Sequence, residues 1–457
     1  MIDPALPNGP FLAYYGDDFT GSSAVMEVMA FAGLPSVMFL APPTAAQIAR
    51  FADCRCIGVA GVSRARSPAW MDEHLPPAFM ALAALGAPLI HYKVCSTFDS
   101  APETGSIGRA ADIGARMFSP AFIPMVVGAP DMGRYQLFGH LFAAVDGIGH
   151  RLDRHPVMAR HPVTPMDEAD LGRHLARQTT RRIGLIDLPT LTGGRGPARL
   201  DALCGDDTPV ISLDVLDGAS LAAAGRLIWD NRARARFVLG SQGVEYALVA
   251  HWRAAGLLPE TAPPPRLPPT ARIAVVSGSC SPITARQIAY AERDGFALLR
   301  LNVALAVDPR AWQGEIARVT GAALAAGRSG RSPLLYTASG PDDPAVAQLA
   351  AAIATSGANG ATVNSAIGRG LGEALAALVV QGGARRVVVS GGDTSGEATS
   401  VLGVTALSAV ADIAPGAPLC RAHADSAPFD GLELALKGGQ TGKPDYFSAV
   451  RNGGPLT

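Results

Sequence analysis

Lysine is the residue type that this chain largely lacks, since only three of its 38 basic residues are Lys and the others are Arg. Lys93, Lys437 and Lys443 each lie in a polar segment with Gly, Ser or Thr nearby, and the last two bracket one loop. A compact ammonium and a planar guanidinium bind anions differently, so a Lys retained in an Arg-rich chain marks a candidate phosphate or carboxylate site. Chance survival during a drift in composition is the alternative explanation.

The chain also lacks an excess of charge, paired cysteines and long apolar runs. Its formal net charge is -1, whereas duplex binders carry a concentrated basic face, so we expect no nucleic-acid partner. Its six Cys show no C-x-x-C spacing, which predicts reduced thiols in a cytoplasmic protein. The start has neither a basic nor an apolar leader region, and no run reaches about 18 apolar residues, so we expect neither export nor membrane insertion.

Several common motifs are missing too. The loop Gly438–Lys443 fails the G-x-x-x-x-G-K-[ST] spacing of a P-loop and is followed by Pro444. Gly368–Gly372 does not fit G-x-G-x-x-G after a strand, so a nicotinamide site has little support. Neither G-x-S-x-G nor H-E-x-x-H occurs, which leaves serine-hydrolase and zinc-protease functions without a basis.

A proline-rich segment divides the chain. At 457 residues the sequence is longer than one hydrophobic core usually supports, so two domains are expected. Six Pro fall between positions 259 and 269, and such a run forms an extended, semi-rigid linker. We therefore predict an N-terminal domain over 1–256, a linker over 257–271 and a C-terminal domain over 272–457.

Both halves show the alternation that is typical of α/β proteins. Short apolar runs predict buried parallel strands, and Ala-rich stretches between them predict helices, so each half is expected to be an α/β domain with a mostly parallel sheet. The predicted strands cover 11–15, 36–40, 56–60, 89–93, 125–129, 183–187, 210–214, 237–240, 273–277, 297–301, 334–337 and 386–390. The predicted helices cover 22–32, 75–85, 167–178, 283–294 and 368–380, and a Gly-rich segment ends the chain.

Ligands of open α/β sheets bind at the carboxyl ends of strands, where polar residues follow several of the predicted strands. Asp17 and Asp18 come directly after the first strand. Adjacent carboxylates at that place can bind sugar hydroxyls, hold Mg²⁺ or act as a base. The alternative for either Asp alone is an N-cap of the helix that follows.

Cations follow the next strands of the N-terminal half. Arg64 and Lys93 are candidates to clamp a carboxylate, with Ser96 and Thr97 donating further hydrogen bonds. A surface ion pair is the alternative for Arg64. Arg134 supplies another cation from a later polar turn.

The C-terminal half carries three Gly-rich loops, 277–284, 391–396 and 437–443. Small residues and backbone N–H groups at helix starts form anion-binding sites, so the three loops together are candidates to hold a triphosphate. Asp393, in the second loop, is placed to hold Mg²⁺ or a hydroxyl group.

With these residues the chain resembles the four-carbon acid sugar kinase family over nearly its whole length. The matching segments are Gly16–Gly21, Lys93–Thr97, His161–Glu168, Val238–Gly243, Val276–Ser279 with Gln287, Gly391–Thr394, Leu436–Gly439 and Asp445–Phe447. The resemblance implies an N-terminal domain that binds the acid sugar, a C-terminal domain that binds ATP, and an active site in the cleft. The implied reaction is transfer of the γ-phosphoryl group from Mg-ATP to a terminal hydroxyl of a small sugar acid.

The resemblance also implies roles for the candidate residues. The base is Asp17, Asp18 or Asp393, and Lys437 neutralises phosphate charge. The substrate-binding residues are Asp17, Arg64, Lys93, Ser96, Thr97 and Arg134. The ATP-binding residues are Ser277, Gly278, Ser279, Gly391, Gly392, Asp393, Thr394, Lys437, Gly438 and Gly439.

One loop departs from the pattern of many relatives, which carry an Asp and an Arg where this chain has the segment Cys95–Asp99. This difference predicts an altered pocket, suited to a 3-oxo-tetronate or a branched 3-oxo acid such as 3-oxo-isoapionate better than to D-erythronate or D-threonate, which stay among the candidate substrates. Two other functions stay open: a sugar-acid-binding protein without catalysis, which would not bind nucleotide, and an oxidoreductase on the same acids.

Overall fold

The computed structural model describes residues 6–145, 147–161, 163–205, 207–260, 264 and 266–456, and of Asp393 it describes the backbone alone. The chain forms two compact units, Met1–Ala262 and Pro263–Thr457.

A parallel sheet forms the centre of the first unit, with the strand order β2-β3-β1-β4-β11-β5-β10-β9. Most of these strands are buried along their length, as expected for strands covered by helices on both faces. They are β1 (Leu12–Gly16), β2 (Ser36–Phe39), β3 (Cys56–Ala60), β4 (Leu89–Lys93), β5 (Ile123–Val126), β9 (Ile183–Ile186), β10 (Val210–Leu213) and β11 (Phe237–Gly240).

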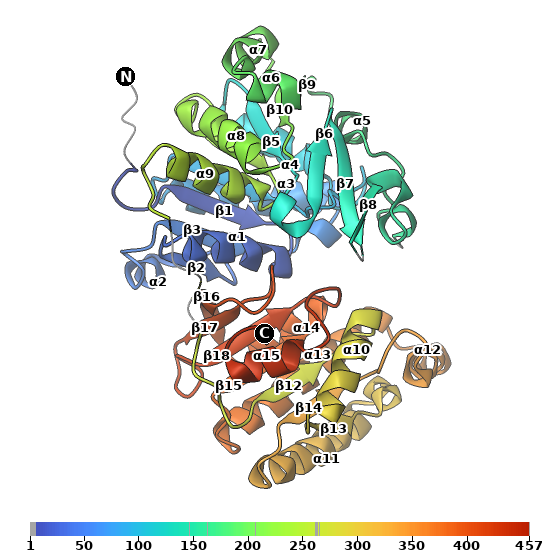
Figure 1. Ribbon diagram of the computed structural model, residues 1–457. Coiled ribbons are helices and arrows are strands. Elements are labelled where there is room, and N and C mark those ends of the chain that lie inside the picture. Colours follow the sequence, from blue (N-terminus) through green and yellow to red (C-terminus); the bar gives the residue numbers. More distant parts are fainter. Residues whose placement is uncertain are drawn as a thin grey trace. The chain divides into compact units, whose positions relative to one another are not determined.

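Helices cover both faces of this sheet (Figure 1). Helices α1, α8 and α9 pack together on one face, and α3 packs with α4 on the other. The helices of the unit are α1 (Phe19–Phe31), α2 (Ala45–Ala49), α3 (Pro68–Ala83), α4 (Ile107–Phe118), α5 (Leu171–Ala176), α6 (Leu188–Thr192), α7 (Gly196–Leu203), α8 (Gly218–Asp230) and α9 (Gly243–Ala254).

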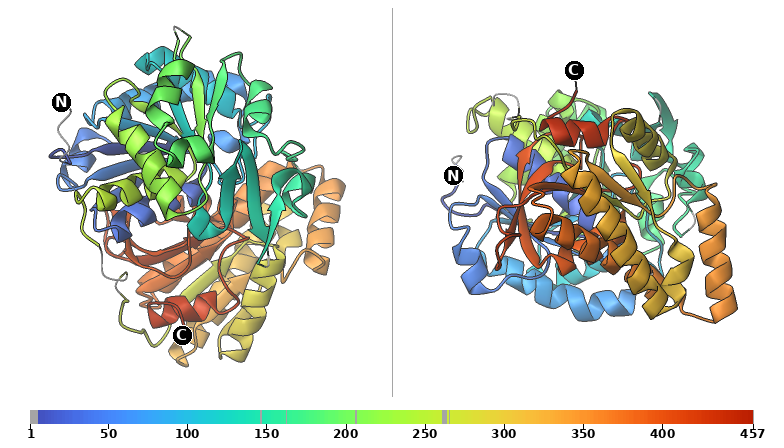
Figure 2. Two further views of the ribbon diagram at one scale, coloured as in Figure 1. Left: turned by 45° about the horizontal axis from the view of Figure 1, so that its top comes forward. Right: turned by 90° about the horizontal axis from the view of Figure 1, so that it is seen from below.

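A small antiparallel sheet, β6 (Arg134–Leu137), β7 (His140–Val145) and β8 (Ile148–Arg151), follows β5 in the chain. Figure 2 shows these teal strands from two further directions. The buried carboxylate of Asp214 fixes the turn between β6 and β7, because it accepts backbone N–H bonds from Phe138 at 2.5 Å and Gly139 at 3.0 Å. It also accepts the N–H of Leu188 at 3.0 Å, and so joins the turn to the start of α6.

A buried ionisable pair lies under the end of β4. His91 Nδ1 is 2.7 Å from Glu245 Oε1 on α9, and His91 Nε2 is 3.0 Å from the carbonyl oxygen of Gly240 on β11. Both side chains are fully buried, so the pair ties β4, β11 and α9 together two residues before Lys93.

The second unit has a parallel sheet in the order β13-β14-β12-β15-β18, which β17 and β16 extend in antiparallel pairing. Its strands are β12 (Ala274–Ser277), β13 (Ala297–Arg300), β14 (Pro333–Tyr336), β15 (Arg386–Ser390), β16 (Val404–Ala411), β17 (Leu419–Ala424) and β18 (Glu433–Lys437). The last three occupy the region for which only a Gly-rich segment was predicted.

Helices α10 and α15 pack against each other, and α13 packs between α11 and α14 (Figure 1). The helices are α10 (Pro282–Arg293), α11 (Pro309–Arg328), α12 (Pro344–Ser356), α13 (Gly360–Val380), α14 (Gly392–Val401) and α15 (Tyr446–Asn452). By length and hydropathy α13 alone among the described helices meets the criteria for a membrane span, but 56% of its apolar window is buried, as in a core helix.

The end of the proline-rich segment packs on the second unit. The N–H of Leu267 donates to Gly453 and that of Thr270 to Arg451, while Arg386 donates to the carbonyl of Pro268. Leu267 and Thr270, on either side of two prolines, thus supply backbone N–H groups, which Pro lacks.

The α/β class and the mostly parallel sheets are confirmed, and most predicted strands agree with the structure to within a residue or two. Several details differ. The strand expected at 125–129 is Ile123–Val126, because the chain then turns toward the small sheet. The helix expected at 167–178 covers only Leu171–Ala176, whereas the helices expected at 75–85 and 368–380 begin earlier, at Pro68 and Gly360. The two antiparallel sheet regions were not predicted.

Replacing Asp214 tests its role in the fold. Asp214→Ala removes the acceptor of three buried N–H groups and should lower the free energy of unfolding by about 2–4 kcal/mol in urea denaturation. Asp201→Ala removes an exposed carboxylate paired with Arg234 and should cost less than about 1 kcal/mol. Equal losses in the two variants would contradict the role assigned to Asp214.

Candidate functional site

Three strand ends meet at one edge of the N-terminal sheet. Gly16, the last residue of β1, lies opposite both Ala60 on β3 and Lys93 on β4. Asp17 then donates its N–H to the carbonyl of Lys93 at 2.9 Å, and Arg64 donates its N–H to the carbonyl of Asp17 at 3.0 Å. The register of parallel strands therefore brings together Asp17 and Lys93, which lie 76 positions apart in the chain.

Arg64 forms ion pairs with both adjacent carboxylates. Its Nε and Nη2 donate to Asp17 at 3.1 and 2.6 Å, and its Nη1 and Nη2 donate to Asp18, each at 2.9 Å. These bonds use four of the five guanidinium N–H groups, which leaves one on Nη1. Asp18 also caps α1, since it accepts the N–H of Gly21 at 2.9 Å. Both alternatives that the sequence left open, the N-cap and the ion pair, are therefore present.

Burial and charge set the protonation of this cluster. Burial raises the pKa of Asp17 above its ordinary value, although Arg64 acts in the opposite direction. Burial opposes the charge on Arg64, but the carboxylates of Asp17 and Asp18 outweigh it and hold the pKa of Arg64 well above its ordinary value. Asp17 is thus a better proton acceptor near neutral pH than an exposed carboxylate.

Lys93 is 2% exposed, and its ammonium makes no hydrogen bond or ion pair with any residue that the structure describes. Its Nζ lies against the α-carbon of Gly21, where a Cβ atom would overlap both Nζ and Asp18 Oδ1. Asp17 acts on the charge of this ammonium and Asp18 lies nearby, but neither carboxylate accepts a hydrogen bond from it, so the buried ammonium is suited to an anionic ligand.

The loop after Lys93 contains a chain of short polar contacts. Cys95 Sγ is 2.9 Å from Thr97 Oγ1, which donates to Asp99 Oδ1 at 2.7 Å. Burial opposes ionisation of Asp99, but Arg64 and the bond from Thr97 hold its pKa below the ordinary value. Ser96 is buried in the same loop. Sequence reasoning noted Asp99 only as part of a departure from the family pattern and gave it no role.

Arg134, at the start of β6, is half-buried. The thiol of Cys95 acts on its charge. Its Nη1 donates to the carbonyls of Met132 at 2.8 Å and Ala144 at 3.3 Å, while its buried Nε has no partner among the described residues. Burial lowers the pKa of Arg134.

In the second unit, strand register gathers the three Gly-rich loops. Ser390 at the end of β15 lies opposite Ser277 on β12 and Lys437 on β18. The loop after β12 leads into α10, whereas the loop after β15 leads into α14, which packs with α13 on the other face. Adjacent strands whose loops leave toward opposite faces form the crevice in which α/β proteins bind ligands.

The loops touch each other closely. A Cβ on Gly278 would overlap Thr394 Oγ1, and one on Gly439 would lie 2.9 Å from Ser279 Oγ. Ser281 caps α10 and also donates to the carbonyl of Gly439. Only glycine fits such contacts without displacing a neighbour. The three Gly-rich loops therefore lie side by side, and the N-termini of α10 and α14 lie at the point where they meet.

Lys437 lies at the base of this place and is fully buried. Its Nζ donates to Ser390 Oγ at 3.0 Å and Thr284 Oγ1 at 3.2 Å, and burial lowers its pKa from the ordinary 10.5 to about 7. The buried Oγ of Ser277 has no partner among the described residues. Gly391, with φ of 124°, and Gly392 begin α14, but the side chain of Asp393 lies outside the described part of the chain.

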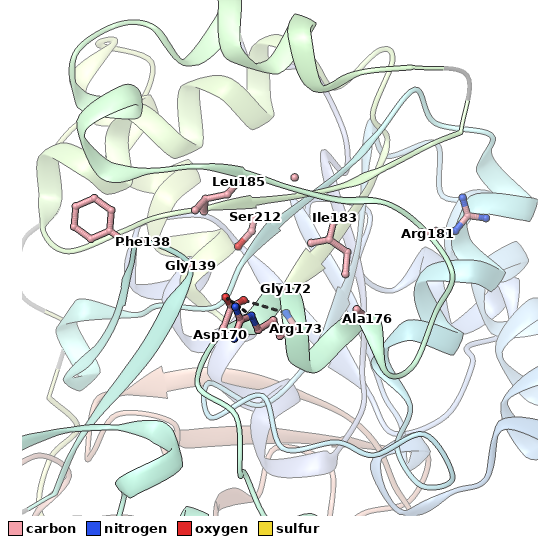
Figure 3. A pocket seen from close by; sticks show the side chains of 11 residues that line it. Phe138, Gly139, Asp170, Gly172, Arg173, Ala176, Arg181, Ile183, Leu185 and Ser212 are labelled. Carbon is pink, nitrogen blue, oxygen red and sulfur yellow. Dashed lines mark hydrogen bonds and ion pairs between the residues drawn. The ribbon is translucent and has the colours of Figure 1, made fainter.

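Lys443, the third lysine, is exposed and takes no part in the contacts between the Gly-rich loops. Figure 3 shows a separate pocket of about 390 Å³ in the first unit, beside α5 and the edge strand β9. Its lining includes Phe138, Ser212 and the pair Asp170–Arg173, and it contains none of the predicted site residues.

Family comparisons match both units. Residues 12–248 match the sugar-binding N-terminal domain family, and residues 274–447 match the nucleotide-binding C-terminal domain family. These ranges contain the two groups of polar residues described above.

Relatives match the chain over nearly its full length. A 3-oxo-isoapionate kinase of Paraburkholderia graminis is 54% identical and covers 98% of this chain and 96% of its own. A 3-oxo-tetronate kinase of Cupriavidus necator is 31% identical and covers 98% of each chain. A crystal structure from Salmonella typhimurium, titled as a putative tRNA synthase, superimposes with a TM-score of 0.77 at 26% identity and covers 96% of this chain and 98% of its own.

Buried Lys437 should make stability depend on pH. Between about pH 7 and 10 the unfolded chain holds a proton at this residue that the folded protein has lost, so the free energy of unfolding contributed here rises with pH by up to about 1.4 kcal/mol per unit. Wild type should therefore gain stability relative to Lys437→Met across that range in urea denaturation. Exposed Lys443→Met is the control, and its difference from wild type should stay constant. A constant difference for Lys437→Met as well would contradict the assigned pKa.

Proposed function

The chain belongs to the four-carbon acid sugar kinase family and is a phosphotransferase with an alcohol acceptor, and we propose that its acceptor is a terminal hydroxyl of a branched 3-oxo sugar acid, 3-oxo-isoapionate. The observation that carries this substrate is the 54% identity, over nearly both full chains, to a kinase of that acid. An unbranched 3-oxo-tetronate, the substrate named for relatives near 30% identity, is the next candidate.

We assign the acid to the N-terminal cluster. Lys93 and Ser96, with Arg134 nearby, bind the carboxylate end of the acid, and Thr97, whose hydroxyl proton is donated to Asp99, holds the loop in shape. Asp17 and Asp18 bind the hydroxyl groups, since ionised carboxylates accept hydrogen bonds from hydroxyls. Arg64 contributes mainly by holding these two carboxylates in place, and one of its N–H groups remains for the substrate.

We assign ATP to the three loops of the C-terminal unit. Ser277 ends β12, and Gly278 and Ser279 follow it. Gly391 to Thr394 form the N-cap and first turn of α14. Lys437 ends β18, and Gly438 and Gly439 follow it. The glycine contacts, two helix N-termini and the unpartnered hydroxyl of Ser277 fit a polyphosphate. Protonated Lys437 then neutralises phosphate charge at the base of this site.

The three Gly-rich loops fit Mg²⁺ only when it is bound together with the nucleotide. No cluster of three His, Cys, Asp or Glu side chains suited to a metal occurs in the described part of the chain. Mg²⁺ in kinases takes most of its ligands from phosphate oxygens and water, with one or two carboxylates, and Asp393 is the carboxylate that we assign. When bound there with the nucleotide, Mg²⁺ would supply charge neutralisation at the phosphates.

The chemistry that these residues support is a single displacement. The hydroxyl oxygen of the acid forms a bond to the γ-phosphorus of ATP, the bond from that phosphorus to the β,γ-bridging oxygen breaks, and ADP leaves. The hydroxyl proton passes to Asp17, whose burial makes it the best described acceptor in the cluster. The ligands are small molecules, and we place the reaction in the cytoplasm.

A coupled assay of ADP release tests this function. With Mg-ATP, 3-oxo-isoapionate should stimulate release more than 3-oxo-tetronate, D-erythronate or D-threonate, and no release should occur without acid. Asp17→Asn should lower turnover by about 100-fold or more and leave ADP affinity unchanged, because it removes a base and not a nucleotide contact. Nucleotide binding without stimulation by any acid would exclude the proposed acceptors, and failure to bind nucleotide would exclude the assigned ATP site.

The space that Gly21 leaves for Lys93 can be tested separately. In Gly21→Ala the new methyl group displaces the ammonium of Lys93 and crowds the carboxylate of Asp18, so the KM for the acid should rise about tenfold or more with unchanged ADP affinity. Gly218→Ala is a matched control in the same unit, because its methyl group would meet nothing within 4 Å. An unchanged KM in Gly21→Ala would remove Lys93 from the acid site.

A further inference from the structure

The cations of the N-terminal cluster differ in how far they are already neutralised. Arg64 is paired with two carboxylates, whereas Lys93 and Arg134 have no carboxylate partner among the described residues. Lys93 is almost fully buried, and the buried Nε of Arg134 lacks any partner in the same described set. Two unsatisfied cationic groups in one cluster are suited to one carboxylate.

Cys95 lies in the loop between Lys93 and Thr97, within range of the charges of these cations. The charges of Arg64 and Lys93 act on its thiol, and the thiol in turn acts on Arg134. Its Sγ is 2.9 Å from Thr97 Oγ1. Because the Thr97 hydroxyl donates its only proton to Asp99, it can only accept from Cys95, so the thiol is the donor in that contact.

The backbone holds Cys95 in this position. The N–H of Phe98 donates to the carbonyl of Cys95 at 2.9 Å, and Phe98 has a φ of 55°, a conformation that a bulky residue rarely adopts. The phenyl ring of Phe98 is fully buried, and Ser100 Oγ donates to its carbonyl at 3.0 Å. Such local strain persists only where surrounding contacts fix it, and it is common at binding sites.

We propose that Cys95 is a specificity-determining residue of the acid site: its neutral side chain borders the subsite in which Lys93 and Arg134 bind the substrate carboxylate. This inference rests on the proposed function, and it identifies the carboxylate as the end of the acid that the loop after Lys93 recognises. A negatively charged side chain at position 95 would neutralise the cations and exclude the carboxylate, whereas an uncharged side chain of similar size leaves their field to the substrate.

A residue that leaves the charge of Lys93 and Arg134 to the substrate must itself be uncharged, and the Cys95 thiol is. Burial and the carboxylate of Asp99 raise the pKa of Cys95 to about 11, although Arg64 and Lys93 act in the opposite direction. Cys95 is therefore an uncharged thiol at neutral pH, despite the cations around it.

A pair of variants separates charge from shape. Cys95→Asp and Cys95→Asn introduce side chains of nearly equal size that differ in charge. With 3-oxo-isoapionate, Cys95→Asp should raise the KM at least about tenfold, whereas Cys95→Asn should stay within about threefold of wild type. The affinity for ADP should not change in either variant. Equal effects of the two substitutions, or a wild-type KM in Cys95→Asp, would overturn the proposal.

Thiol labelling of the wild-type enzyme tests the subsite without relying on a variant that folds. Iodoacetamide at about pH 9 should modify Cys95 slowly, and 3-oxo-isoapionate should slow this reaction about fivefold or more, as measured on the peptide by mass spectrometry. Erythritol, which lacks a carboxylate, should give no protection, and exposed Cys280 in the other unit should react at the same rate with or without acid. An unchanged rate at Cys95 would overturn the proposal.

These measurements distinguish the two proposals. Protection of Cys95 without turnover of any acid would retain the carboxylate subsite and reject the proposed reaction. Turnover of the acid with no protection and no difference between the variants would retain the reaction and reject the subsite.

Discussion

In-register pairing of parallel strands positions both groups of functional residues. In the N-terminal unit Gly16 is opposite both Ala60 and Lys93, and in the C-terminal unit Ser390 is opposite both Ser277 and Lys437. A slip of one residue in any of these strands would turn its side chains to the other face of the sheet. These strands are buried on both faces, so a slip would move side chains of different size into packed layers and draw the polar residue at the strand end into the core.

Each unit buries one lysine without a carboxylate partner among the described side chains. Lys93 lies beside Gly21 and Asp18, and Lys437 donates to the hydroxyls of Ser390 and Thr284 and lies over the ring of Tyr446. These two buried lysines are suited to anions, whereas the third lysine, Lys443, is exposed. Asp17 and Asp18, in contrast, are held by Arg64, whose planar fork matches carboxylates.

The parallel strands could be predicted because buried apolar runs such as Cys56–Ala60 are visible in the sequence itself. The polar loops could be located because they begin where those runs end. The sequence did not predict β6 to β8 or β16 to β18, because half-buried strands such as β16 lack an uninterrupted apolar run and gain their stability from pairing. The pairing of Arg64 with Asp17 and Asp18 was likewise open, since sequence spacing does not reveal which charges meet. Asp99 was missed for the same reason.

Burying Lys437 with hydroxyl groups as its hydrogen-bond partners makes the second unit less stable than its apolar core would allow, and an anion bound there relieves that deficit. By mass action a ligand at 100 times its dissociation constant adds about 2.7 kcal/mol to the stability of a fold that binds it. Under the proposed assignment of ATP to these loops, the lifetime of this protein in a cell is tied to the nucleotide supply, because starvation that empties the loops also raises the unfolded fraction available to proteases.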